Sequence, residues 1–233
     1  MPYYYGVDTT YLIYILPALV LALFAQFHVR STFARYSGVL CARGITGAEA
    51  ARQILDRNGL YHVRVEPVEG RLSDHYDPRA QAVRLSKDVY AGRSVASVGV
   101  AAHECGHAVQ HSVGYGPLRL RNAIIPVTQF SSSVSIWLVL IGFVFSFSAL
   151  VLAGVLFFSL AVLFQLITLP VEYNASARAV ETLGREKILT GAELAGARKV
   201  LGAAALTYVA ATVVAFANLL RLVSLYTGMR RRD

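Results

Sequence analysis

The sequence contains little charge. Asp, Glu, Lys and Arg make up 15% of its 233 residues, whereas a typical soluble domain contains about 25%. Apolar residues make up 55%, so the composition excludes an ordinary soluble globular protein and predicts a membrane protein. Cysteine is also scarce, since Cys41 and Cys105 are the only two. This excludes a small secreted fold that is held together by a disulfide framework.

Acidic residues are fewer than basic ones. The chain carries 14 Asp and Glu against 22 Lys and Arg, for a formal net charge of +8. The basic residues are spread along the chain rather than clustered. They therefore indicate contact with the anionic headgroups of a lipid bilayer and argue against a nucleic-acid partner.

Three long stretches contain no residue that is ionised at neutral pH. The first, residues 9–29, would span about 31 Å as a helix, which matches a hydrocarbon core of about 30 Å. It lacks the basic residues before it and the cleavage site after it that define a signal peptide. Residues 123–171 are too long for one crossing and predict a hairpin of two helices with its turn near residues 146–149. Residues 201–220 predict a fourth, weaker apolar helix.

Basic residues beside these stretches predict the orientation of the chain. The N-terminal flank and the hairpin turn have none, and the other flanks carry Arg30, Arg35, Arg43, Arg119, Arg121, Arg178, Arg185 and Lys187. We therefore expect a multi-pass protein of the cell membrane with its N-terminus outside and residues 30–122 and 172–200 in the cytoplasm. Three arginines at 230–232 conflict with a crossing by residues 201–220, so whether that segment spans the membrane stays open.

The segments between the apolar stretches predict a small α+β domain. Periodicity predicts three strands, which we expect to pair as a short antiparallel sheet, over residues 61–68, within 71–78 and over 81–86. It predicts helices over residues 47–58, 94–112, 172–184 and 190–200. The first of these helices begins with a capping box that is formed by Thr46 and Glu49.

The predicted fold class is thus a membrane α+β protein with four hydrophobic helices. Its predicted parts are an N-terminal transmembrane helix (1–29), a cytoplasmic domain (30–122), a transmembrane hairpin (123–171), two further helices (172–200), and a C-terminal hydrophobic helix with a basic tail (201–233).

One motif indicates a metal site with a general base beside it. His103-Glu104-Cys105-Gly106-His107 lies within the predicted helix over residues 94–112. Residues four apart share one helix face at a spacing of about 6 Å, so both histidines can bind one metal ion, and Glu104 lies beside it as a general base. Zinc suits neutral imidazole nitrogen, and its catalytic sites combine three protein ligands with a water. The alternative is a helix that carries two histidines by chance.

The third ligand distinguishes the classes of zinc enzyme. An extended HExxHxxGxxH motif is excluded, because the chain has Gln110 and Val113 where that motif has glycine and histidine. No aspartate lies between the motif and the last residue, so the aspartate ligand of a site-2-type intramembrane protease is missing. Among the glutamates we favour Glu172, because it follows the hairpin directly and Ala175 and Ala179 would let its helix approach closely. The alternatives, in charged surroundings, are Glu181, Glu186 and Glu193.

Other polar residues are tied less closely to the motif. His111 lies about 12 Å beyond His103 along the helix, so we expect it to be solvated or to line the cleft rather than to bind the same ion. His75 is interpreted as part of a polar turn, with a second metal site as the alternative. The strand over residues 81–86 is predicted to form the edge that binds an extended substrate. The residue that would stabilise an oxyanion is left open among Tyr173, His111 and Arg178, and Cys105 is expected to be structural.

Several segments resemble known membrane peptidases. Glu172-Tyr-Asn-Ala-Ser176 resembles the ExxAD motif of gluzincin membrane proteases of the HtpX and CAAX prenyl protease types. Together with residues 46–51, 74–78, 99–108 and 169–176, it makes the chain most similar to the YugP-like family of neutral zinc metallopeptidases. This resemblance implies a zincin-like (gluzincin) domain, zinc ligands His103, His107 and Glu172, and Glu104 as the catalyst.

The chain departs from the family pattern at one position. Ser176 replaces the aspartate of ExxAD, which in that pattern orients a histidine ligand from the second shell. We expect Ser176 or Asn174 to supply the hydrogen bond instead.

The sequence therefore predicts a membrane-embedded, zinc-dependent endopeptidase that hydrolyses peptide bonds with a zinc-activated water at the cytoplasmic membrane face. Its expected partners are protein or peptide substrates, with membrane proteins among the options. The alternative is an inactive zinc-binding membrane scaffold or adaptor, which Ser176 favours. A channel or transporter is the weakest interpretation, because no ionisable group that marks such a function falls inside the predicted spans. The sequence does not indicate the oligomeric state.

Overall fold

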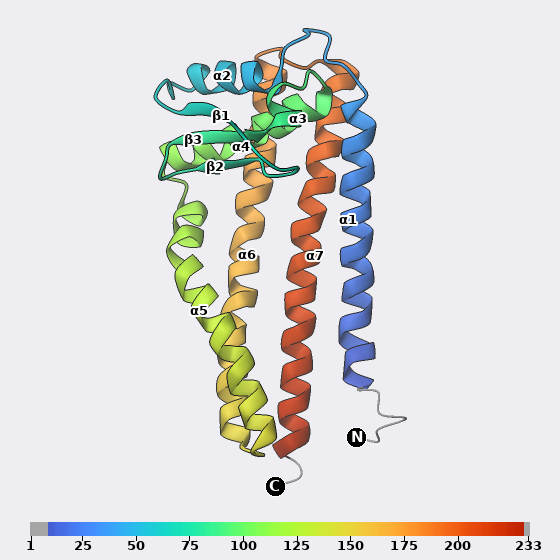
Figure 1. Ribbon diagram of the computed structural model, residues 1–233, viewed down its shortest axis with the longest axis vertical. Coiled ribbons are helices and arrows are strands. Elements are labelled where there is room, and N and C mark those ends of the chain that lie inside the picture. The colour runs from blue at the N-terminus through green and yellow to red at the C-terminus, as the bar shows by residue number, and fades with distance from the viewer. Residues whose placement is uncertain (1–8, 231–233) are drawn as a thin grey trace. The chain divides into compact units, whose positions relative to one another are not determined.

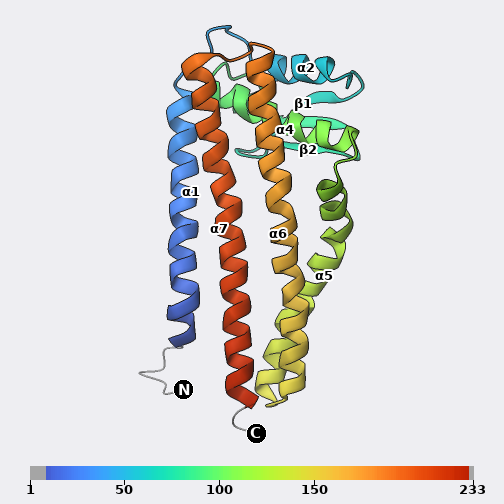
Figure 2. The same cartoon turned by 180° about the vertical axis from the view of Figure 1, so that it is seen from behind.

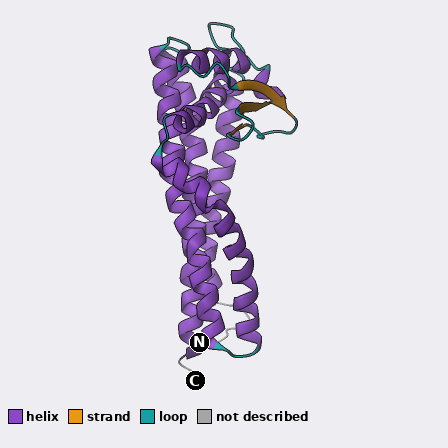
Figure 3. Cartoon of the chain, turned by 90° about the vertical axis from the view of Figure 1, so that its left-hand side faces the viewer, coloured by secondary structure: helices purple, strands orange, loops and turns teal. Residues whose placement is uncertain are grey.

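The computed structural model describes residues 9–230 and is mostly helical (Figure 1). In chain order the elements are a π-helical turn (Tyr11–Ile15), α1 (Leu16–Ser37), α2 (Gly47–Arg57), β1 (Arg64–Val68), β2 (His75–Asp77), β3 (Ala82–Ser86), α3 (Lys87–Tyr90), α4 (Val95–Ser112), α5 (Gly116–Val144), α6 (Ser148–Arg185) and α7 (Gly191–Arg230). Within the described residues, the strands are confined to one small sheet (Figure 3).

Four helices are long and apolar enough to cross a membrane: Tyr11–Ser37, Gly116–Val144, Ser148–Arg185 and Gly191–Met229. They correspond to the four predicted apolar helices. The chain divides into two compact units. The first contains the described residues up to Ala25, Leu120–Leu169, and those from Thr207 onward, and the second contains Gln26–Arg119 and Pro170–Leu206.

Most of the hairpin of α5 and α6, Leu120–Leu169, belongs to the first unit. Helix α5 ends at Val144 and α6 begins at Ser148, so the turn lies where the sequence predicted it. The two helices pack through small residues. The Ser135 hydroxyl donates to the Gly154 carbonyl at 2.8 Å, and a Cβ at position 154 would lie 2.6 Å from Cγ2 of Val139. Such close backbone approach is how helices associate in lipid, where hydrophobicity alone does not hold them together.

The last two helices are longer than predicted. Helix α6 continues through Pro170 to Arg185, and α7 covers residues 191–230 without a break. The expected end of the hairpin at residue 171, and the separate helices over 172–184 and 190–200, were therefore wrong. A proline removes one hydrogen bond from a helix and bends it. It need not end the helix where the residues on both sides remain helical.

The sheet lies in the second unit and is mixed. Its strand order is β1-β3-β2, with β1 parallel and β2 antiparallel to β3. The predicted all-antiparallel sheet was therefore wrong, and β3 is the central strand rather than an edge. A tight turn joins β2 to β3 and forces these two strands antiparallel. No turn joins β1 to β3 directly, because β2 comes between them in the chain, so β1 can pair with the other side of β3 in the parallel direction. Alternation of side chains fixes which residues face the core but not the direction of pairing.

One face of the sheet is apolar and packs on the helices. Val83 and Leu85 of β3 are fully buried, and they join a core with α2 and α4, which lie beside the sheet in both views (Figures 1 and 2). Helix α2 begins with the predicted capping box. The Glu49 amide donates to Oγ1 of Thr46 at 3.1 Å, and the Thr46 amide donates to Oε2 of Glu49 at 2.7 Å.

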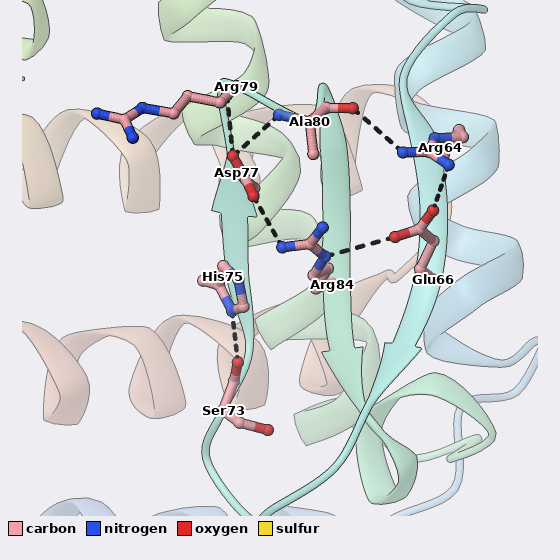
Figure 4. Close-up of polar contacts among 8 residues, drawn as sticks. All are labelled: Arg64, Glu66, Ser73, His75, Asp77, Arg79, Ala80 and Arg84. Atoms are coloured by element: carbon pink, nitrogen blue, oxygen red, sulfur yellow. Dashed lines mark hydrogen bonds and ion pairs between the residues drawn. The ribbon is translucent and has the colours of Figure 1, made fainter.

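The opposite face of the sheet carries a chain of ion pairs (Figure 4). Glu66 of β1 pairs with Arg64 at 2.9 Å and with Arg84 of β3 at 3.4 Å, and Arg84 pairs with Asp77 of β2 at 2.7 Å. Asp77 also accepts hydrogen bonds from the amides of Arg79 and Ala80 in the turn to β3. These contacts link all three strands through Arg84.

Candidate metal centre

Helix α4 positions the two histidines of the HExxH motif. Ser94 caps its N-terminus, because the Ser97 amide donates to the Ser94 hydroxyl at 3.0 Å. His103 and His107 then fall on the same face, with ring centroids 4.8 Å apart and ring planes at 85° to one another. Glu104 lies on the same helix and is 8% exposed.

Helix α6 brings the third group. Glu172 lies one residue beyond the buried Val171 and is itself buried. The two helices approach closely because α4 has a glycine at the contact. A Cβ at Gly106 would lie 2.6 Å from the backbone oxygen of Ala175. Ala175 and Ala179 are both buried, which confirms the expectation that small residues let this helix approach.

The three side chains converge. Oε2 of Glu172 lies 3.3 Å from Nε2 of His103 and 3.5 Å from Nε2 of His107. The potential ligand atoms of all three residues lie within 4.8 Å of one another. Ligands that bind one zinc ion at about 2.0–2.1 Å with tetrahedral angles lie roughly 3.3 Å apart. The observed spacing therefore fits a divalent cation bound by these three atoms.

The electrostatics of the cluster also suit a cation. Burial opposes a positive charge on His107, but the hydrogen bond to Glu172 and the carboxylates of Glu104 and Glu172 outweigh it and raise the pKa of His107. This negative field attracts a proton and a metal ion alike. Two imidazole nitrogens and one carboxylate are a ligand set that zinc prefers.

Comparison with known proteins places the chain in a family. The model of a family described as "putative neutral zinc metallopeptidase" matches residues 11–227. The chain is 52% identical over 213 residues, which are 91% of this chain and 95% of the relative, to a protein of Bacillus subtilis (strain 168) that is named "Putative membrane protease YugP". No solved structure matches the chain significantly.

The chain belongs to this zinc metallopeptidase family. The resemblance that the sequence motifs indicated is thereby confirmed, and with it the assignment to a family of membrane-associated zinc peptidases. Zinc is the metal of the family, and His103, His107 and Glu172 form the candidate site for it in this member.

The departure from ExxAD has a visible consequence in this member of the zinc metallopeptidase family. The Ser176 hydroxyl lies 3.1 Å from Nδ1 of His103, which is the contact that we expected from Ser176 or Asn174. Asn174 points elsewhere, since its Oδ1 accepts from Gln110 at 3.0 Å and from Arg178 at 2.8 Å.

The alternative glutamates are engaged away from the cluster. Glu181 pairs with Arg185, and Glu186 pairs with Arg57 and Arg185. The Ala42 amide donates to Glu193. These contacts leave Glu172 as the glutamate that meets the two histidines.

The remaining predicted residues lie outside the ligand cluster. Nδ1 of His111 is 2.9 Å from the Tyr76 hydroxyl of β2, and Tyr173 is half exposed. His75 is exposed on β2, where its Nδ1 lies 2.7 Å from the Ser73 carbonyl. Cys105 is fully buried and contacts the Ala51 carbonyl of α2, and burial raises its thiol pKa. A thiol in that environment is inert, in agreement with a structural role.

Sequence reasoning missed one residue of the site. Gln110 is fully buried, and its Oε1 lies 3.0 Å from Nδ1 of His107. Its spacing of three residues from His107 was the signal that could have found it, because residues three apart on a helix are neighbours. A glutamine among the alanines and valines of a buried helix is a second signal, since buried polar groups need hydrogen-bond partners.

Proposed function

We propose that this protein is a membrane-embedded, zinc-dependent endopeptidase whose site is formed by His103, His107, Glu172 and Glu104. The observation that supports it most is the convergence of two Nε2 atoms on one carboxylate oxygen at 3.3 and 3.5 Å, in a chain of the zinc metallopeptidase family. The proposed mechanism is of the gluzincin type.

Each residue then has one task. His103, His107 and Glu172 would hold the metal. Bound zinc supplies Lewis acidity, which polarises a peptide carbonyl and makes a water molecule more acidic. Glu104 accepts the proton of the attacking water and delivers it to the leaving amine nitrogen. Its position directly after His103 on α4 places its carboxylate in the electrostatic environment of the ligands.

The structure also suggests where an extended substrate binds. Because β3 is central, the proposed edge moves to β2, which has a partner on one side only among the described strands. A peptide that pairs with this free edge would use main-chain hydrogen bonds. Tyr76 of β2 contacts His111 of α4, so this strand and the HExxH helix lie next to each other.

We further propose that the site faces the cytoplasm, as the positive flanks of the apolar helices indicate. Protein or peptide substrates, among them membrane proteins, would then meet the site at the inner membrane surface.

The experiment compares the wild type, Glu104→Gln and Glu172→Ala as full-length protein in detergent. Casein cleavage and zinc content are measured in parallel, with and without a chelator. We expect Glu104→Gln to keep zinc but to lose about 100-fold or more of the cleavage rate, since general-base catalysis contributes about 10²–10⁴-fold. Glu172→Ala should lose both. Glu181→Gln, on the same helix as Glu172 but paired with Arg185, is the matched control and should change neither.

Two outcomes would contradict the proposal. Full activity of Glu104→Gln would remove Glu104 from the mechanism. A wild type that binds zinc but cleaves no substrate would favour the zinc-binding scaffold, the function to which the serine at position 176 points.

A further inference from the structure

We propose that Gln110, oriented by Asn174, Arg178 and the Val171 carbonyl, is a positioning residue that fixes His107 as the tautomer with its proton on Nδ1. This inference rests on the proposed zinc centre. It assigns a task to a residue that contacts none of the three atoms proposed to bind the metal. The argument depends on two groups in a chain of hydrogen bonds, one that can only donate and one that can only accept.

The first fixed point is Arg178. A guanidinium has donors and no acceptor, so its Nε, 2.8 Å from the Asn174 side chain, must face the amide oxygen of that residue. Oδ1 of Asn174 is therefore directed toward Arg178. The same oxygen lies 3.0 Å from the side-chain amide of Gln110. Because an amide oxygen only accepts, the Gln110 atom that faces it must be the donor Nε2.

The second fixed point is the Val171 carbonyl. A backbone carbonyl only accepts, and Nε2 of Gln110 donates to it at 2.8 Å. Both N–H groups of the Gln110 amide are thus used, one on Val171 and one on Asn174. A flipped amide would place its oxygen against two acceptors. The orientation of Gln110 is consequently set at both ends.

The consequence for His107 follows directly. Oε1 of Gln110 faces Nδ1 of His107 at 3.0 Å, and an amide oxygen cannot donate, so Nδ1 carries the proton. In the neutral ring, Nε2 then presents its lone pair toward Oε2 of Glu172, 3.5 Å away. A lone pair directed at a carboxylate oxygen is the arrangement that a cation between them requires.

His103 has no comparable restraint. A serine hydroxyl can donate or accept, so Ser176 at 3.1 Å from Nδ1 of His103 leaves both tautomers open. Of the two histidine ligands, His107 is therefore the one whose Nδ1 faces a group that can only accept, the Gln110 amide oxygen. Gln110 is fully buried on α4, and Val171, Asn174 and Arg178 flank Glu172 on α6, so the same bonds hold the ligands of both helices in register.

The test measures zinc affinity of the full-length protein in detergent by competition with a chromogenic chelator. We expect Gln110→Met, which keeps the length but removes the amide, to bind zinc about 10–100-fold more weakly, as is typical when a second-shell partner is lost. Asn174→Leu should lower the affinity in the same direction. Asn174→Asp, which keeps an acceptor for both Gln110 and Arg178, should restore it to within a few-fold of wild type.

The matched control is Ser97→Ala. Ser97 is also a buried polar residue of α4, and it bonds to Ser94 and to the Asp88 carbonyl, away from the ligands. Its substitution should lower the thermal stability of the metal-free protein without changing zinc affinity. The control separates a loss of helix stability from a loss of ligand orientation.

The outcomes distinguish this inference from the proposed function. If the wild type binds zinc and both Gln110→Met and Asn174→Leu bind it equally well, the role of Gln110 is refuted and the zinc centre stands. Equal weakening by Asn174→Asp and Asn174→Leu would also refute it. A wild type that binds no zinc would overturn the centre and this inference together. The two Asn174 variants keep the test decisive even if Gln110→Met does not fold.

Discussion

Ser176 contacts one of the two histidine ligands and carries no charge, so it affects how that ligand is held. It lies one turn after Glu172 on α6, and its hydroxyl takes the place of an aspartate carboxylate at Nδ1 of His103. A carboxylate there would accept only and would make the ring a more basic ligand. The neutral hydroxyl holds the ring but contributes no negative charge.

This difference leads to a prediction. We expect Ser176→Asp to tighten zinc binding by up to about tenfold and Ser176→Ala to weaken it by about tenfold, in line with the effects of second-shell partners. Chelator competition on the purified protein measures both. Ser112→Asp, a change of the same kind at an exposed position of α4, should have no effect. Unchanged affinity in both Ser176 variants would show that the 3.1 Å contact does not support the ligand.

At the scale of the elements, the contact between α4 and α6 determines whether a site exists. His103 and His107 come from one helix and Glu172 from the other, so the spacing of the helices sets the distance between the ligands. Gly106 lies where the two helices approach closely, and it faces the backbone of Ala175. The position of Glu172 beside the two histidines therefore depends on the absence of a Cβ at residue 106.

We therefore predict that Gly106→Ala disrupts the site. Alanine favours a helix over glycine by about 1 kcal/mol, but its Cβ would lie 2.6 Å from a backbone oxygen that cannot rotate away. Overpacking of this kind costs about 1–3 kcal/mol, and separation of the helices would lower zinc affinity as well. Thermal unfolding and zinc titration measure the two effects.

Gly99→Ala is the matched control on the same helix. There the new Cβ would lie 3.4 Å from Cβ of Ala197, an ordinary contact. It should be neutral or slightly stabilising. A Gly106→Ala variant that behaved like Gly99→Ala would contradict the role of the close approach.

The sheet gives a prediction about pH. The amide of Ala80, followed by the amide of Arg79 and the Arg84 guanidinium, holds the pKa of Asp77 below its ordinary value. A carboxyl whose pKa is lower in the folded state stabilises the fold above its unfolded pKa of about 3.9 and loses that contribution as the pH falls through the folded value.

Asp77→Asn should therefore be less stable than the wild type at neutral pH and should show a shallower loss of stability on acidification. The two proteins should converge below both pKa values. Melting temperatures in detergent, measured from pH 7 down to below both pKa values, provide the test. Parallel curves for the two proteins would mean that the ionised carboxylate of Asp77, with its contacts to Ala80, Arg79 and Arg84 shown in Figure 4, adds nothing to stability.

At the scale of the whole molecule, the charges beside the apolar helices give a prediction about orientation in the membrane. Four helices are long and apolar enough to span it, and the positive flanks favour a cytoplasmic location for residues 30–122. The two native cysteines are buried, with exposed fractions of 3% for Cys41 and 0% for Cys105. New cysteines on the surface can therefore report on sidedness against a low background.

We predict that a membrane-impermeant maleimide labels Tyr61→Cys only in inverted vesicles and Ser146→Cys only in intact spheroplasts. Tyr61 is 74% exposed, and Ser146 is an exposed residue of the hairpin turn. Labelling of both from one side would show that the hairpin does not cross. The reverse pattern would place the site on the outer face.

Local and regular features were determined by the sequence itself. The lengths of the apolar stretches, the capping box at Thr46 and Glu49, and the four-residue spacing of His103 and His107 all depend on neighbours within a few positions. Each such feature follows from the periodicity of a helix or from the thickness of a bilayer. The turn between α5 and α6 belongs to the same class.

The tertiary structure decided what depends on residues far apart in the chain. The direction of β1, the continuity of α6 through Pro170, and the two partners of Gln110 on α6, which lie 61 and 64 residues away from it, follow from how segments pack. In the sequence, Gln110 only excludes the HExxHxxGxxH motif, because it stands where that motif has glycine. In the structure, where α6 packs against α4, it contacts the ligand His107. The local spacing indicates only the contact with His107, because Val171 and Asn174 are brought beside Gln110 only when the helices pack.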